Sequence, residues 1–226
     1  MTSQALQDAV KAHTDFLAAQ QEQFRLSLPL WRLLAEGKPI EPEQLATVSH
    51  RSLKEIRALL QSSDVRVDQA GNILAFGLSL QPTPHQFHLG EQALYTWCAL
   101  DALAFPPLLG RAARVIFTCP ATGTEIRLTV TPERIERLEP TRAVVSVRLP
   151  GEETDLCNVQ EDICNAGYFF VSHEVASTWP SLHPRAVLLS VEEAGELGRE
   201  LARQFLALEQ EPEVHYPSSS GTSRDG

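Results

Sequence analysis

Residues 95–106 read YTWCALDALAFP, an apolar run that contains one thiol, Cys98, and one carboxyl group, Asp101. The run predicts a helix over residues 91–105, ended by the two prolines that follow. Because helix positions three apart share a face, we expect the thiol and the carboxyl group to lie together in surroundings poor in water. A thiol can act as a nucleophile or metal ligand and a carboxyl group as a proton carrier, and apolar surroundings shift the pKa of both.

Each of these two residues, taken alone, also has a structural explanation. A cysteine in an apolar helix is most often a small buried hydrophobe. Asp101 would then lie on an exposed seam of the helix. Against this, a buried carboxylate costs free energy unless it is paired or used in chemistry. These two residues alone do not distinguish a structural core helix from a helix that carries a functional site.

Outward from this helix, the chain alternates between strands, turns and helices. From residue 209 the composition turns to Pro, Ser and Gly, which predicts a disordered tail over residues 209–226. The order predicts an α+β domain over residues 81–208, with antiparallel strands flanked by helices. The expected elements are a linker over 78–88 that leads into a strand at 85–89, strands over 115–119, 125–131, 143–149 and 186–191, a loop entering a buried strand over 163–171, and a helix over 192–208.

Residues 1–80 predict a small helical module of the winged-helix type. Apolar residues recur with helical period over 24–34 and 53–60, and Pro42 fits the first turn of a further helix. Residues 65–76 then alternate around a Gly-Asn turn, which is typical of a two-stranded hairpin. Three helices followed by such a hairpin form the winged-helix pattern.

The charge of the chain argues against nucleic acid as a partner. Residues 51–58, the candidate recognition helix, have three basic residues and one acid, but the module as a whole has eight Lys or Arg against nine Asp or Glu. A basic face supplies most non-specific DNA affinity, and this module has none. The net charge of −10 also disfavours an anionic membrane surface. We therefore expect a structural or lid role for the module.

Composition and cysteine spacing suggest a cytoplasmic protein. The chain has 226 residues, of which 43% are hydrophobic, enough for a substantial core. It shows no secretory signal pattern and no apolar run approaching the roughly 20 residues that span a bilayer. The cysteines at 98, 119, 157 and 164 match neither a redox pair nor a zinc ribbon. In a reducing compartment we expect them to be free thiols.

Common catalytic motifs such as a phosphate loop, a His-Glu-x-x-His pair or a nucleophile elbow are missing from the sequence. Residues 94–106 and 110–115 instead closely resemble the organomercurial lyases, also called alkylmercury lyases or MerB. The resemblance covers roughly residues 21–208 and is looser over 21–80. It continues in the same order through residues 119–123, 128–130, 164–170, 190–194 and 198–200.

The resemblance implies a catalytic set of two cysteines and one aspartate. These carry over onto Cys98, Cys164 and Asp101, and a structural cysteine of the family falls on Cys119. Familiar members have a further cysteine and histidines just after the second catalytic cysteine, whereas this chain has Asn-Ala-Gly at 165–167. The two cysteines and the aspartate are all kept despite this change. The changed loop affects what can be expected of substrate preference and product handling.

The chemistry suits these residue types. Two thiolates are soft ligands that bind mercury and weaken its bond to carbon, and the departing carbon then needs a proton. Asp101 can take the proton of a thiol with a pKa of ~8.5 and hand it to carbon, because an apolar pocket and a nearby thiolate raise its own pKa from ~3.9. More than a turn inside its helix, Cys98 is expected to gain little from the helix dipole.

The sequence therefore predicts an organomercurial lyase that needs no cofactor beyond external thiols. Cytosolic thiols or a mercuric reductase would take the Hg(II). A non-catalytic Hg or Cu(I) thiolate carrier on the same fold is the main alternative, and a winged-helix metal sensor is a third. Cys157, seven residues before Cys164, would either pass mercury onward or be a bystander, and we favour the bystander.

Overall fold

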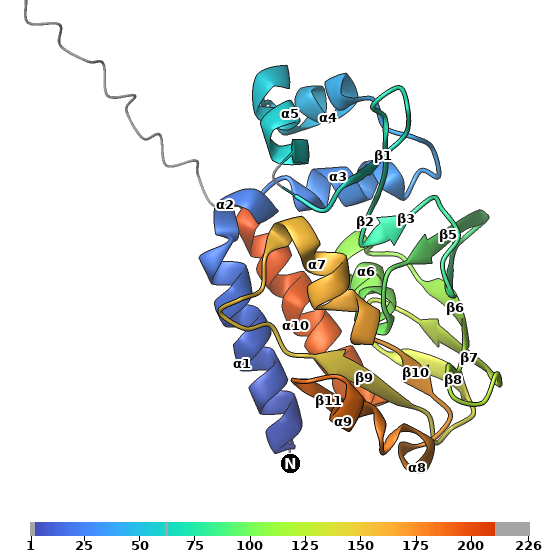
Figure 1. Ribbon diagram of the computed structural model, residues 1–226. Helices are drawn as coiled ribbons and strands as arrows, with labels where there is room; N and C mark the ends of the chain where they lie inside the picture. Colours follow the sequence, from blue (N-terminus) through green and yellow to red (C-terminus); the bar gives the residue numbers. More distant parts are fainter. Residues whose placement is uncertain (1–2, 62, 211–226) are drawn as a thin grey trace, which may run out of the picture.

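The computed structural model describes residues 3–61 and 63–210 (Figure 1). The disordered tail predicted over 209–226 lies outside these residues, except for 209 and 210, which continue the last helix. The helices are α1 (Gln4–Ala19), α2 (Gln21–Phe24), α3 (Ser27–Leu34), α4 (Pro42–Ser49), α5 (Leu53–Gln61), α6 (Ala99–Leu109), α7 (Val159–Asp162), α8 (His173–Ala176), α9 (Trp179–Leu182) and α10 (Val191–Gln210), with the 3₁₀ helices η1 (Leu156–Asn158) and η2 (Cys164–Ala166). The strands are β1 (Arg66–Val67), β2 (Ile73–Phe76), β3 (Leu78–Ser79), β4 (His85–Leu89), β5 (Gln92–Thr96), β6 (Ala113–Thr118), β7 (Glu125–Val130), β8 (Ile135–Glu139), β9 (Val144–Arg148), β10 (Phe169–Phe170) and β11 (Ala186–Ser190).

The strands form two antiparallel sheets, as the predicted α+β class requires. The larger sheet has the order β1-β2-β3-β5-β4-β6-β7-β8, and the smaller has the order β10-β9-β11. Helices α1, α10 and α6 lie side by side next to the sheets, while α3, α4 and α5 form a separate group at one end (Figure 1). Among the described residues, no helix is long and apolar enough to cross a lipid bilayer.

The N-terminal module has the predicted winged-helix arrangement of α3, α4, α5 and the β1–β2 hairpin. Pro42 occupies the start of α4, where its missing N–H is not needed, and Glu41 and Gln44 form a reciprocal capping box there. Gly71 in the hairpin turn has a φ of +88°, a conformation that favours glycine. Local sequence signals therefore fix this module.

Helix α1 buries its apolar stripe against the second half of the chain. Leu6, Ala9, His13 and Leu17 recur every three or four residues and are buried. The helix packs against α10 and β11, although it falls within the module predicted over residues 1–80. The domain boundaries at residues 80 and 208 remain a prediction.

The helix predicted over residues 91–105 is wrong at its start. Residues 92–96 form strand β5, which pairs with both β3 and β4, and α6 begins only after Cys98. The turn between β4 and β5 contains Gly90, which has a φ of +64°. Pairing on two sides outweighs helix propensity here. The prolines at 106 and 107 lie inside the last turn of α6, which Gly110 ends in the left-handed conformation.

The other strand predictions agree with β4, β6, β7, β9 and β11 to within two residues at each end. The turn between β6 and β7 closes through a hydrogen bond from the Gly123 N–H to the Cys119 carbonyl. Besides β5, two strands were not predicted. Leu78 and Ser79, at the start of the linker predicted over 78–88, form β3, and β8 has no clear apolar alternation because its residues are half-buried or exposed.

The core is centred on α6, which is buried along most of its length. Helix α10 crosses it closely, because a Cβ atom at Gly198 would lie 2.9 Å from the backbone carbonyl of Leu103. Apolar side chains of the large sheet, including the fully buried Phe87 and Phe117, pack into the same core. The first turn of α6 is therefore held from several directions, and this turn carries the candidate site.

Candidate active site

Cys98 is the N-cap residue of α6, which corrects the prediction that it lies more than a turn inside its helix. Its backbone is extended, with φ −146° and ψ 174°, and its Sγ accepts a hydrogen bond from the Asp101 N–H at 3.4 Å. The Asp101 Oδ2 accepts a hydrogen bond from the Cys98 N–H at 3.1 Å. The two side chains thus form a capping box in which sulfur replaces the usual hydroxyl. The positive end of the helix favours a thiolate at this position.

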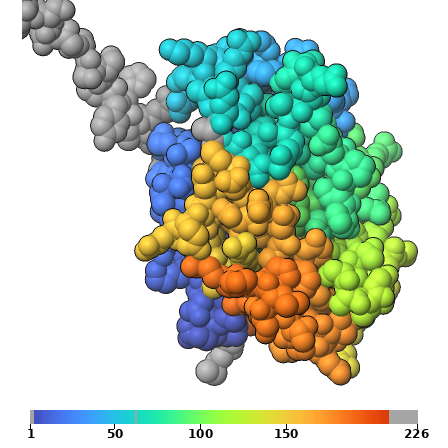
Figure 2. Space-filling view, viewed as in Figure 1, coloured from blue at the N-terminus to red at the C-terminus, as the bar shows by residue number. Residues whose placement is uncertain are grey.

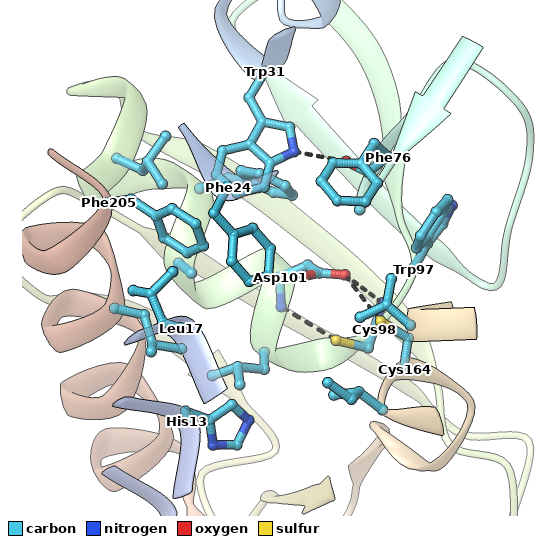
Figure 3. A pocket seen from close by; sticks show the side chains of 18 of the residues that line it. His13, Leu17, Phe24, Trp31, Phe76, Trp97, Cys98, Asp101, Cys164 and Phe205 are labelled. Carbon is cyan, nitrogen blue, oxygen red and sulfur yellow. Dashed lines mark hydrogen bonds between the residues drawn. The ribbon is translucent and has the colours of Figure 1, made fainter. Parts of the chain in front are cut away.

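Cys164 comes from η2 and completes the set. Its Sγ donates a hydrogen bond to the Asp101 Oδ2 at 3.8 Å, and one ligand atom each from Cys98, Asp101 and Cys164 lie within 4.8 Å of one another (Figure 3). We call these three residues the thiol–carboxyl cluster. Residues 66 positions apart in sequence therefore meet, as the predicted catalytic set requires.

A glycine makes this approach possible. The Gly167 carbonyl accepts a hydrogen bond from the Ala99 N–H at 3.0 Å, which ties η2 to the first residue of α6. A Cβ atom at Gly167 would lie 2.8 Å from the Cys98 Cβ and 3.2 Å from the Cys164 carbonyl oxygen. Those distances are shorter than normal carbon contacts, so any larger residue would push the two thiols apart.

Burial dominates the electrostatics of the cluster. It raises the pKa of Asp101 to about 6, against hydrogen bonds from Cys98 and Cys164 that favour the ionised form. Burial also raises the pKa of Cys98, although its contact with Cys164 works in the opposite direction. The contact with Cys98, followed by burial, raises the pKa of Cys164 well above its ordinary value. Both thiols are therefore protonated at neutral pH in the free protein.

A cavity of about 120 Å³ lies beside the cluster, and we call it the aromatic cavity. Rings from α2, α3, β2 and α10, together with the residue just before Cys98, form its walls (Figure 3). The Trp31 and Phe205 rings meet edge to face at 4.8 Å between centroids, and the Trp31 indole N–H donates to the Phe76 carbonyl at 2.7 Å. The labelled Phe and Trp residues of the wall are Phe24, Trp31, Phe76, Trp97 and Phe205.

The N-terminal module thus supplies walls of the cavity. The sequence predicted a structural or lid role for this module but not its part in the cavity wall. On the face shown in Figure 2, the segment with η1, α7 and η2 lies at the surface between α1 and this module. Val159 and Ile163 of that segment line the cavity, as Cys164 does. The cluster is therefore enclosed by parts of the chain that are far apart in sequence.

The remaining cysteines lie outside the cluster. Cys119 is buried, and although burial alone would raise its pKa, hydrogen bonds from the Thr122 side chain and from backbone N–H groups lower it overall. Cys157 is exposed on η1. Asn165, which stands where familiar organomercurial lyases have another residue type, is exposed, whereas Cys164 is buried. The changed loop therefore leaves the cluster itself intact.

One polar residue of the cavity wall was not predicted from the sequence. His13 of α1 lines the aromatic cavity and is 6% exposed. A signal was available, because His13 occupies a position of the apolar stripe of α1, where a histidine is unusual.

Together, the fold and the cluster define a class: α+β proteins in which a winged-helix-like module encloses a buried site of two thiols and a carboxyl group. A family model described as alkylmercury lyase matches residues 78–203, and a model described as the helix-turn-helix domain of alkylmercury lyase matches residues 6–77. The chain belongs to the alkylmercury lyase family. It is therefore an enzyme of the lyase type, as the resemblance predicted.

Individual relatives agree with this assignment. The alkylmercury lyase of Streptomyces lividans is 41% identical over 209 residues, which cover 91% of this chain and 96% of the relative. That of Staphylococcus epidermidis is 40% identical over 178 residues, covering 78% and 81%. The crystal structure of the mercury-bound form of MerB2 shares the fold, with a TM-score of 0.71 at 21% identity, covering 88% of this chain and 99% of that chain.

Proposed function

We propose that this chain cleaves the carbon–mercury bond of alkyl and aryl mercurials by protonolysis, with Cys98 and Cys164 binding mercury and Asp101 transferring the proton. The observation that carries the proposal is the buried cluster, in which the two sulfur atoms and a carboxylate oxygen lie within 4.8 Å of one another beside an apolar cavity. Mercury would bind to the sulfur atoms while its organic group occupies the cavity.

The first step is a thiol exchange on a mercurial that arrives as its thiol adduct. The Cys98 sulfur forms a bond to mercury and the carrier thiolate leaves, taking the Cys98 proton. Cys98 acts first because the start of α6 favours its ionised form. One thiol is released and one sulfur–mercury bond replaces another.

The second step adds Cys164 and moves its proton. Since the Cys164 sulfur donates to the Asp101 carboxylate in the free enzyme, its proton passes to Asp101 as its sulfur binds mercury. Asp101 then gives this proton to the carbon as the carbon–mercury bond breaks. The hydrocarbon leaves, Hg(II) stays on two sulfurs, and the carboxylate is restored.

The pKa of Asp101 suits a residue that must both accept and donate. At about 6 it lies close to neutral pH, where a proton carrier works best in each direction. A carboxyl group at its ordinary pKa of ~3.9 would hold the proton too weakly to deliver it to carbon. Burial in the cavity wall is therefore part of the proposed chemistry.

Turnover then requires removal of Hg(II) from the two thiols. We infer that small cytosolic thiols or a mercuric reductase take it, and that no resident cofactor takes part. The need for reduced Cys98 and Cys164 supports a cytoplasmic location. The absence of a basic face on the N-terminal module, which instead walls the cavity, supports a role without nucleic acid or membrane.

The test is to incubate the reduced protein with a phenylmercury salt and excess thiol and to measure benzene. We expect stoichiometric benzene and Hg(II), and a folded, reduced protein that releases no benzene would overturn the proposal. Asp101→Asn should lower turnover by about 10² to 10⁴ while leaving Hg(II) uptake within a few-fold of the wild type. Asp8→Asn, a matched change at an exposed carboxyl group of α1, should alter neither.

The same pair of variants separates the lyase from a thiolate carrier. A carrier needs the two thiols alone, so Asp101→Asn would leave all of its measurable behaviour unchanged. Benzene release that depends on Asp101, combined with Hg(II) uptake that does not, fits the lyase and contradicts the carrier.

A further inference from the structure

Ala104 lies in the wall of the aromatic cavity, on the same face of α6 as Asp101. Both residues line the cavity, and they are three positions apart in the helix. From Ala99 to Pro106, every residue of α6 except these two is buried. Because positions three apart share a face of a helix, the Ala104 methyl group lies about 4.5 Å further along the helix axis than Asp101, on the cavity side.

The wall of the cavity contains few small side chains. Apart from Gly77, every residue that lines the cavity has a larger side chain than Ala104. Gly77 itself leaves little room, because a Cβ atom there would lie 3.2 Å from the Phe105 ring and 3.6 Å from the Asp101 Oδ1. Ala104 is therefore the position at which a short side chain, with accessible surface left on it, widens the cavity.

The proposed reaction fixes where the organic group begins. Asp101 delivers a proton to the carbon that is bound to mercury, so this carbon must contact the Asp101 carboxyl group. A methyl group ends at that carbon, whereas a ring or a longer chain extends beyond it. Further along α6, the cavity wall continues with Ala104, Phe105 and Leu108. The part of the organic group beyond the first carbon would therefore meet Ala104.

The size of the cavity leaves no room to spare. An apolar protein cavity of about 150 Å³ binds benzene, so a cavity of about 120 Å³ suits one small ring or a short alkyl chain. Protein interiors are closely packed, and extra carbon atoms in such a space cause strain. A few atoms added to the wall would therefore decide whether a ring fits.

Building on the proposed function, we propose that Ala104 determines substrate size: its short side chain leaves the space, one helical turn from Asp101, that admits aryl and longer alkyl groups. A larger side chain at this position would fill the space and exclude these groups. Methylmercury would still fit, because its organic group ends beside Asp101. Ala104 has no ionisable group, so it acts on substrate choice and not on proton transfer.

The kinetic test compares phenylmercury with methylmercury. The ratio of their kcat/KM values is measured in the wild type, in Ala104→Leu and in Ala104→Val, so that the different reactivities of the two carbon–mercury bonds cancel between the proteins. The ratio of phenylmercury to methylmercury should fall about 100-fold in Ala104→Leu, which adds three carbon atoms, and about tenfold in Ala104→Val, which adds two. The matched control Ala46→Leu, at a half-buried alanine of α4 outside the cavity wall, should leave the ratio unchanged.

A second measurement needs neither mercury nor a variant. Benzene is added to the wild-type protein while the ¹H–¹³C resonances of the alanine methyl groups are followed, because an aromatic ring shifts the resonance of a methyl group that it contacts. The Ala104 resonance should move, and the Ala46 resonance should stay in place. This arm decides the matter where the variants at position 104 fail to fold.

The outcomes distinguish this inference from the function on which it rests. If neither mercurial yields hydrocarbon with the wild type, the proposed function fails. If both are cleaved but a folded Ala104→Leu keeps the wild-type ratio, or if benzene leaves the Ala104 resonance in place, the role of Ala104 is refuted while the lyase activity stands.

Discussion

At the scale of single residues, Gly167 fixes the distance between the two thiols. Its φ of −93° and ψ of 91° are open to alanine, so the constraint comes from space alone. We expect Gly167→Ala to reduce benzene release from phenylmercury by about 10², because a displacement near 1 Å at reacting atoms has that effect. Its free energy of unfolding should fall by about 1–3 kcal/mol through overpacking.

The matched control for this change is Gly151→Ala. A Cβ atom there meets only the ends of the Arg185 and Glu153 side chains, which can move. Turnover and thermal unfolding should therefore stay close to the wild type. Full activity in Gly167→Ala would show that the thiols do not need the spacing seen in the structure.

The buried His13 also predicts a pH dependence of stability. Its pKa is lowered from 6.5 to about 4 on folding, so the unfolded chain binds this proton more readily. The stability that the neutral ring contributes is complete above pH 6.5 and is lost as the pH falls from 6.5 toward 4, by up to roughly 3 kcal/mol.

The measurement is the difference in the free energy of unfolding between wild type and His13→Leu at several pH values. A difference is needed because Asp101, with a raised pKa, contributes in the opposite direction over an overlapping range. The wild type should lose stability relative to His13→Leu as the pH falls from 6.5 to 4. Parallel curves would mean that His13 titrates normally.

The residues of the cluster could be predicted from the sequence, but their surroundings could not. Cys98, Asp101 and Cys164 were found because a specific run of residues resembles a known family. The apolar stripe of α1 marks His13 as unusual, but its place in the cavity wall depends on how α1 packs against α10 and beside the cavity. The sequence pattern of a single segment does not show which distant segment it will contact.

At the scale of elements, Cys98 combines two roles, because it caps α6 as well as belonging to the thiol–carboxyl cluster. Serine is a strong N-cap residue and alanine a poor one. We therefore expect Cys98→Ser to lose turnover while keeping its free energy of unfolding. Cys98→Ala should lose turnover and about 1 kcal/mol of stability as well.

Benzene release and chemical denaturation of the two variants separate these roles. Equal stability in the serine and alanine variants would indicate that the sulfur does not cap the helix. Cys119→Ser is a suitable comparison, since Cys119 is buried but lies outside the cluster and starts no helix. It should retain turnover.

The start of α6 also shows where sequence patterns fail. Residues 93–105 are mostly apolar, and periodicity alone cannot separate a strand from the helix that follows. What divides them is the pairing of β5 with β3 and β4, which involves residues up to 18 positions away, such as Leu78 opposite Thr96. Strands with their own turn signals, such as β6 and β7, were placed correctly.

At the scale of the whole molecule, mercury on Cys98 and Cys164 would link α6 to η2. A ligand that binds only the folded state stabilises it, by about 2.7 kcal/mol at 100 times its dissociation constant. For a chain of this size, we expect the Tm to rise by roughly 5–10 °C in Hg(II). The measurement is made in a Cys157→Ser background, which removes the exposed thiol.

Replacing Cys164 by serine in that background should abolish most of this rise, because one thiolate alone cannot link the two segments. An undiminished rise would place the bound mercury elsewhere. The whole-molecule arrangement behind this prediction was only partly visible in the sequence. The lack of a basic face in the sequence argued against DNA binding by the N-terminal module. It did not indicate that the aromatic rings of this module would enclose the cavity.

The aromatic cavity has an optical consequence. Two of the three tryptophans, Trp31 and Trp97, line it, and the third, Trp179, donates its indole N–H to the carbonyl of Ala166, two residues after Cys164. Mercury is a heavy atom that quenches indole fluorescence at short range. An ion held by the two thiols would therefore dim the emission of the protein itself, and its removal by an acceptor thiol would restore it. The chain thus contains its own fluorescent reporter, through which each round of loading and release can be followed without a label.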